Sequence, residues 1–151
     1  MMEGITIKCI DNKEMALSLV WNVFLEFEAP EYSEDGIKEF HTSIHEEAYL
    51  RQLCMHGAFL DDKLVGVIAT RNEKSHIALF FVDGKYHRQG IGRKLFEAAK
   101  SDCNSDKITV NSSPYAVPVY TKLGFHQTDK EQVVNGIRFT PMELRTCGIW
   151  I

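Results

Sequence analysis

Two glycines stand at the start of an amphipathic helix in the stretch YHRQGIGRKLFEAAK, residues 86–100. From Ile91 onward the apolar residues recur at helical spacing, so Gly90 and Gly92 lie at the helix entrance and not in a turn between strands. Glycine costs stability there, because it loses more backbone freedom on folding than any other residue. Bare first-turn amides with basic neighbours favour a bound anion. A strand-to-helix turn that needs glycine only for packing explains the same letters equally well.

The flanking segments predict a mixed α/β order. The almost wholly apolar run at 76–84 is typical of a strand buried on both faces. In the first half of the chain, we expect a strand at 4–10, a helix at 11–27 stopped by Pro30, a helical region at 33–53 broken once, and a hairpin at 57–71 turning at 61–63. The strand at 76–84 follows, and then a helix at 90–102, a strand at 106–112 and a short helix at 113–125. The last two strands are expected around a type I′ turn at 135–136. The fold class is therefore α/β (α+β), with a single mixed, mostly antiparallel central sheet flanked by helices in the order β-α-α-β-β-β-α-β-α-β-β.

The short helix at 113–125 carries residues that favour its two ends. Ser113 is expected as the N-cap, Pro114 at the first helical position and Gly124 at the C-terminal end. In the last strand, the apolar residues expected to face the core are Ile137, Phe139 and Met142, and the alternative is that this segment lines the substrate side of the sheet.

Length and charge restrict the class of protein. A chain of 151 residues with a formal net charge of −4 predicts a single domain over 1–151 and argues against nucleic acid as the main partner. No apolar run reaches membrane length, and no signal-peptide core precedes the first strand. Four widely spaced cysteines indicate free thiols in a reducing compartment: Cys9, Cys54, Cys103 and Cys147. We therefore expect a cytoplasmic protein without a membrane partner, and a homodimer stays open.

The element order, with VDGKYHRQGIGRKLF after the fourth strand and YTKLGF about thirty residues later, resembles the GNAT superfamily of acyl-CoA-dependent N-acetyltransferases. The topology resembles this family over nearly the whole chain, and the motifs match over residues 77–125. The family pattern at the glycine loop is Gln/Arg-x-x-Gly-x-Gly/Ala, and His87 stands here where Gln or Arg is usual. The resemblance implies acetyl-CoA as co-substrate, and no metal is expected.

By this resemblance, the bound anion is the pyrophosphate of coenzyme A, held by main-chain groups of Arg88, Gln89, Gly90, Ile91, Gly92 and Arg93. The backbone of Phe80, Phe81 and Val82 is expected to pair with the pantetheine arm, between splayed fourth and fifth strands. Ser113 falls where many relatives have an asparagine that contacts the cofactor, and helix capping explains this serine equally well. Asn111 faces the cleft or is simply the polar end of a strand.

Tyr120 is the expected acid for the departing thiolate, since it occupies the position of the family's tyrosine. A tyrosine that only packs in the core is the structural alternative. The amide near Val82 is the expected donor to the oxyanion. The general base does not follow from the pattern, because Ile108 stands where some relatives have a carboxylate. The candidates are Glu28, Glu31, His41, His45 and His76, and a water relay or a neutral substrate needs none of them.

The predicted function is therefore an N-acetyltransferase that moves an acetyl group from acetyl-CoA to a primary amine of a small molecule or a peptide, by direct attack in a ternary complex. A non-catalytic acyl-CoA-binding module is the alternative, and transfer of a longer acyl group also stays open. The acidic and aromatic region 24–39 is expected to cover the acceptor site and to favour a cationic amine. His41 and His45 have a metal-capable helical spacing but no third ligand in the pattern.

Overall fold

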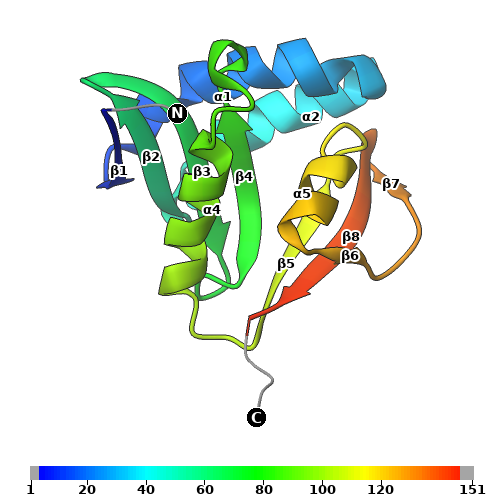
Figure 1. Cartoon of the computed structure of the whole chain (residues 1–151). Helices are drawn as coiled ribbons and strands as arrows, with labels where there is room; N and C mark the ends of the chain where they lie inside the picture. Colours follow the sequence, from blue (N-terminus) through cyan, green and yellow to red (C-terminus); the bar gives the residue numbers. More distant parts are fainter. Residues whose placement is uncertain (1–3, 147–151) are drawn as a thin grey trace.

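The computed structural model describes residues 4–146 and contains one twisted sheet with helices on both faces (Figure 1). All its strand pairs are antiparallel except the parallel pair β4–β5, so the expected mixed, mostly antiparallel sheet is confirmed. The strand order across the sheet is β1 (Ile5–Ile10), β2 (Cys54–Leu60), β3 (Lys63–Arg71), β4 (His76–Val82), β5 (Lys107–Ser112), β8 (Ile137–Arg145) and β6 (His126–Gln127), and β7 (Gln132–Val134) pairs with β8. The chain ends with three strands where two were expected, because His126–Gln127 adds a short strand beside β8.

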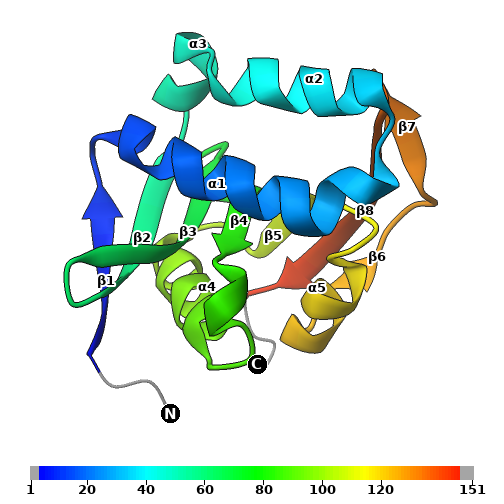
Figure 2. The ribbon, with the colours of Figure 1, turned by 90° about the horizontal axis from the view of Figure 1, so that it is seen from above.

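The helices form two layers, which Figure 2 shows on opposite sides of the sheet. One layer holds α1 (Leu17–Val23), α2 (Glu34–Ile44) and α3 (Glu47–Arg51), and the other holds α4 (Ile91–Asp102) and α5 (Val117–Leu123). The helix expected at 11–27 is divided into a 3₁₀ turn, α1 and a π-helical turn at Phe24–Glu28. π-helical turns are rare in proteins, and those that do occur are often found at functional sites.

Two apolar clusters hold these layers to the sheet. The stripe that predicted α4 is buried as expected: Ile91, Leu95, Phe96 and Ala99 are each at most 3% exposed. Burial of a large apolar side chain contributes about 1.5–3 kcal/mol. The glycine-led start of α4 is therefore fixed against the sheet by its own apolar face.

β4 and β5 pair over only two residue positions, His76 with Thr109 and Ile77 with Val110. Beyond Ile77 the two strands diverge, as the family resemblance implied. Burial along β4 consequently alternates between buried and half-buried residues, so the expectation of burial on both faces was wrong. Two of the half-buried residues, Phe80 and Val82, pack against the apolar cluster that includes Ile91 and Leu95 of α4.

The short helix begins later than the sequence indicated. α5 starts at Val117, with Pro118 in its first turn, and its N-cap position is Ala116. The Ser113 hydroxyl accepts a hydrogen bond from the Ala116 amide at 3.2 Å, so Ser113 caps the turn before α5 and not the helix itself. Pro114 lies in that turn.

The C-terminal end of α5 is confirmed at Gly124, whose φ is +107°. The Gly124 amide bonds to the Thr121 carbonyl and the Phe125 amide to the Tyr120 carbonyl, which together form a Schellman motif. The Phe125 ring packs edge-on against Tyr120 at 5.3 Å between centroids. Gly124 therefore ends the helix and Phe125 fixes the Tyr120 ring. Neither residue explains why the ring at position 120 carries a hydroxyl group.

The hairpin β7–β8 turns at Asn135–Gly136 as expected, with φ values of +53° and +80°. Its tip packs against the start of α2 so closely that a Cβ on Gly36 would lie 2.1 Å from the Gly136 carbonyl oxygen. Arg138 strengthens this contact through Glu31, at 3.0 Å. The hairpin and α2 therefore form one continuous wall.

The last strand presents its apolar residues to two different sides. Met142 is buried in the core at 2% exposed. Ile137 and Phe139, which have the opposite parity in the strand, are half-buried and line a cavity described below. Their expected core-facing position was wrong.

None of the helices within residues 4–146 is both long and apolar enough to cross a membrane. Cys9, Cys54 and Cys103 are free thiols, and Cys147 lies outside the described residues.

Candidate active site

The start of α4 presents open backbone amides. Gly90 is the N-cap with a φ of +87°, a conformation that side-chain-bearing residues rarely adopt, and no atom lies within 4 Å of the position its Cβ would take. The amides of Ile91, Gly92 and Arg93 belong to the first helical turn, which has no intrahelical acceptors for them. This is the geometry that the anion site requires.

Gly92 has a different reason to be glycine. Its φ lies outside the left-handed region, and a Cβ there would lie 3.6 Å from the Phe80 ring and 3.9 Å from Val82, which are ordinary contacts. Gly92 lines a cavity between α4 and α5. A side chain at this position would therefore project into that cavity without disturbing the backbone.

His87, the departure from the family pattern, ties the glycine loop to the sheet. Its Nε2 donates to the Val82 carbonyl at 2.7 Å, and its ring packs on Phe27 at 4.7 Å between centroids. The carbonyl at the end of β4 is therefore occupied by the loop that follows it. This hydrogen bond requires a ring nitrogen at the position of His87, and it does not require His87 to contact the cofactor.

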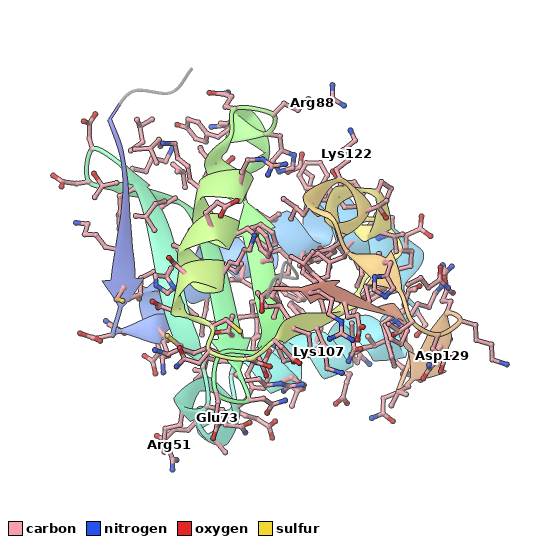
Figure 3. The ribbon with its side chains drawn as sticks, turned by 60° about the horizontal axis from the view of Figure 1, so that its bottom comes forward. Arg51, Glu73, Arg88, Lys107, Lys122 and Asp129 are labelled. Atoms are coloured by element: carbon pink, nitrogen blue, oxygen red, sulfur yellow. The ribbon has the colours of Figure 1, made fainter. Side chains whose placement is uncertain are left out.

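The cavity beside the loop has a volume of about 580 Å³. Arg88 and Lys122 place positive charge on its rim, and Figure 3 shows both at the same end of the molecule. Of the expected cofactor contacts, Phe80, Phe81, Val82, Arg88 and Gly92 line this cavity. Gln89, Gly90 and Arg93 are exposed in the adjoining loop and first helical turn, and Ile91 is buried beneath it.

The backbone of β4 offers hydrogen-bonding groups to this cavity at alternate residues. The Asp83 amide bonds to the Val65 carbonyl, so the pair Gly66–Val82 is of the type whose own amides point away from the partner strand. Phe80 has the same parity, whereas Phe81 uses its backbone groups in the ladder with β3. Phe80 and Val82 therefore direct their amides toward the space beside β5.

This alternation predicts a hydrogen-exchange pattern in the free protein. The amides of Leu79 and Phe81 should exchange more than about tenfold more slowly than the amide of Phe80, because only the first two are bonded within the sheet. Coenzyme A should slow the Phe80 amide if the pantetheine arm lies along β4. Equal protection at all three positions, measured by NMR, would contradict the register.

A second cavity, of about 450 Å³, lies beneath α2 and the β7–β8 hairpin. Asn111 and Ser113, which were expected beside the cofactor, line this cavity and not the first one. The residues that line both cavities are Glu28, Phe80, Phe81, Ala116 and Tyr120. The two cavities therefore meet at one wall, which carries one carboxyl and one phenol.

Glu28 ends the π-helical turn, and its carboxyl lies in that shared wall. Burial raises the pKa of Glu28 from 4.5 to about 7, and a hydrogen bond from Ser113 partly opposes the rise. Burial, and then the charge of Glu28, raise the pKa of Tyr120 above its ordinary value. The same two causes raise the pKa of Tyr32. The carboxyl is thus poised near neutral pH, and the phenols stay protonated.

The other candidate bases are less suitable. Glu31 is paired with Arg138, and His41 and His45 contact each other on the outside of α2. His76 lies in the second cavity, but burial and then Arg71 lower its pKa to about 4, so it is a weak base. Glu28 is therefore the candidate that combines position with an appropriate pKa.

A family model described as "Acetyltransferase (GNAT) domain" matches residues 28–146. The chain belongs to the GNAT acetyltransferase family. It is therefore an acyl-CoA-dependent acetyltransferase by family, and its acceptor is a separate question. No curated protein is similar enough to the chain to count as a match.

Solved GNAT structures share the fold at low sequence identity. A GCN5-related N-acetyltransferase from Rhodopseudomonas palustris is 19% identical, with a TM-score of 0.81 over 96% of this chain and 98% of that one. The PaiA N-acetyltransferase from Thermoplasma acidophilum, in complex with coenzyme A, is 19% identical, with a TM-score of 0.70 over 93% and 98%. An aminoglycoside 6′-N-acetyltransferase complexed with coenzyme A is 12% identical, with a TM-score of 0.65 over 97% and 99%. At these identities the likeness establishes the fold.

Of the acidic residues expected to cover the acceptor site of this GNAT protein, only Glu28 and Glu39 line the second cavity. Arg71 also lines it, and sequence reasoning missed this residue. An arginine at the end of a hairpin strand resembles any solvated strand end, so the sequence carries no signal for it.

A cluster outside both cavities also went unnoticed in the sequence. Cys54, His56 and Asp102 place one potential metal ligand each within 4.8 Å of one another, on β2 and at the end of α4. His56 is 3.2 Å from Asp102, a contact that joins the sheet to that helix. This cluster takes no part in the site of the GNAT fold described above.

Proposed function

We propose that this protein transfers an acetyl group from acetyl-CoA to a primary amine, of a small molecule or a peptide, by direct attack in a ternary complex. The observation that carries the proposal is the shared wall, in which Glu28 and Tyr120 stand where two cavities meet. The first cavity, with the open amides of Ile91, Gly92 and Arg93 beside it, suits the pyrophosphate and arm of acetyl-CoA. The second suits the amine.

The proposed reaction requires two proton movements. An alkylammonium with a pKa of roughly 10.4 is almost fully protonated at pH 7, so the amine must lose a proton to attack. The Glu28 carboxylate accepts this proton, and the free amine nitrogen then bonds to the thioester carbon. The carbon–sulfur bond breaks as the tetrahedral intermediate loses a second proton from nitrogen, and this proton reaches the departing sulfur through Tyr120. The products are an N-acetyl amide and the thiol of coenzyme A. We assign stabilisation of the oxyanion to the amides of Phe80 and Val82, a role supported by their direction away from β3.

Tyr120 assists the departing sulfur. Its raised pKa makes complete proton transfer to a thiolate unfavourable while Glu28 is charged, so the hydroxyl begins as a hydrogen-bond donor. Burial is the larger cause of the raised pKa and persists when Glu28 accepts the amine proton, so only the smaller contribution of the Glu28 charge disappears. In the proposed sequence Glu28 acts first as the base, and Tyr120 then donates to the sulfur as it receives the second amine proton.

Direct attack is supported by the lining of the cavities. No cysteine among residues 4–146 lines either one, so neither offers a thiol for an acetyl-enzyme intermediate. The test is release of free thiol from acetyl-CoA with a panel of amines, at varied concentrations of both substrates. Intersecting double-reciprocal plots support a ternary complex. Tight binding of coenzyme A without thiol release for any amine would instead favour a binding module.

Tyr120→Phe should lower turnover by roughly 10–10³-fold, a loss of about 1.4 to 4 kcal/mol in transition-state stabilisation. The phenyl ring keeps the packing on Phe125, so stability and coenzyme A affinity should change little. The deficit should shrink above the thiol pKa of roughly 8.5, where the thiolate needs its proton less. Full turnover in a folded variant from pH 6 to 9 would remove Tyr120 from the mechanism.

A further inference from the structure

Arg71 ends β3 beside His76, the first residue of β4, and lines the second cavity. Its side chain is half-buried and lies over the Tyr49 ring, with 6.0 Å from Cζ to the centroid. Within the described residues, no carboxylate lies within ion-pair distance of the guanidinium and no side-chain or main-chain acceptor hydrogen-bonds to it. Glu39, which lines the same cavity, is also unpaired with it.

The surroundings leave this positive charge uncompensated. Burial and then Arg71 lower the pKa of His76 to about 4, so His76 is neutral at physiological pH. Burial raises the pKa of Tyr49 while Arg71 opposes the rise, so this phenol carries no negative charge either. A guanidinium withdrawn from water is costly unless an anion faces it. Its planar fork matches a carboxylate better than any other side chain does.

The distance along β4 between Arg71 and the proposed reaction centre determines how long an acceptor must be to reach both. His76 and Phe80 are four residues apart, roughly 13 Å at about 3.3 Å per residue. Even allowing for the reach of the arginine side chain, the anion site and the reaction centre are separated by several bond lengths. Phe40, Ile137 and Phe139 line the cavity with apolar surface.

We propose that the acceptor is an amino acid-like molecule whose primary amine and carboxylate are separated by several carbon atoms, with the carboxylate bound by Arg71. This inference rests on the proposed function, because it names the acceptor class of that same cavity. An ω-amino acid, or a diamino acid acetylated on its side chain, has the required form. A simple α-amino acid does not, since its two groups are adjacent.

The test is a series of ω-amino acids from 3-aminopropanoate to 8-aminooctanoate, each compared with its ω-amino amide. Wild-type protein should acetylate the longer acids with a kcat/KM about 10- to 100-fold above that of the matched amides. Arg71→Gln should abolish the preference for acids over amides, and Arg71→Lys should retain part of it. Because the ratio is taken within one protein, partial loss of folded material cancels.

Arg51→Gln is the matched control, since Arg51 lies on α3 with Tyr49 but points into solvent and pairs with the exposed Glu47 (Figure 3). It should leave the ratio unchanged. Equal rates for acids and amides in wild-type protein, or an acid preference that survives Arg71→Gln, would overturn the inference while leaving acetyl transfer intact.

Calorimetric titration of the acids and amides into the protein with coenzyme A provides a second readout. The carboxylate site is supported if the acids bind to wild-type protein and Arg71→Gln weakens this binding about 10- to 100-fold, even if no amine is acetylated. In that outcome the proposed function fails and the carboxylate site stands. Equal binding of acids and amides contradicts the site whatever the turnover.

Discussion

Glu28→Gln should lower kcat by about 10²–10⁴-fold, the range that general-base catalysis typically contributes. Glutamine keeps the size and the hydrogen-bonding capacity of the side chain but cannot accept the amine proton. In wild-type protein, kcat/KM should rise through about pH 7, because the pKa of Glu28 is about 7 and only its deprotonated form is a base. That rise should disappear in the variant.

Stability provides the control for this variant. The pKa of Glu28 is higher in the folded protein than in the unfolded chain, so its ionised form destabilises the fold, and stability is lost as pH rises through about 7. Glu28→Gln should therefore stabilise the protein by about 1 to 3 kcal/mol at pH 8. Denaturant unfolding measures this gain. Wild-type turnover in the stabilised variant would indicate a water relay or a neutral substrate in place of Glu28.

Gly92→Glu should weaken coenzyme A binding by more than about 100-fold, because it places bulk and negative charge in the cavity where the phosphates are expected. The backbone tolerates this change, since a Cβ at Gly92 makes only ordinary contacts. An acidic residue in the first turn of α4 also favours the helix dipole. Loss of binding in calorimetry can therefore not be attributed to unfolding.

Gly92→Ala is the matched control and should retain most of the affinity, because it adds only the methyl group. Gly90→Glu should abolish binding as well, but the φ of +87° at Gly90 strains any side chain there. Wild-type affinity in a folded Gly92→Glu protein would show that the cofactor lies elsewhere.

The fold could be predicted from the sequence where local chemistry decides it. The periodicity of α4, the Asn135–Gly136 turn and the glycine end of α5 each depend on a few neighbouring residues, and all three are confirmed. The start of α5 was wrong by three residues, because Ser113–Pro114 has the sequence of a helix start and instead forms a preceding turn.

The candidate site could be predicted only in part. The glycine loop is a contiguous motif and therefore visible in the sequence. Glu28 was one candidate base among five, because its burial depends on the meeting of two cavities formed by distant segments. Arg71 gave no signal at all, since its unpaired state is a property of the residues around it in space. The roles of Glu28 and Arg71 depend on residues that are distant in the sequence, so these roles become visible only in the structure.

The contact between Gly36 and Gly136 joins two segments that line the second cavity, the proposed acceptor site. The α2 start and the hairpin tip touch through bare backbone, and a methyl group on either glycine would push the two segments apart. Both segments belong to the wall of the second cavity, whereas neither glycine lines it or the wall that Glu28 and Tyr120 share. A single substitution at either position is therefore expected to change the shape of the proposed acceptor cavity without replacing Glu28 or Tyr120.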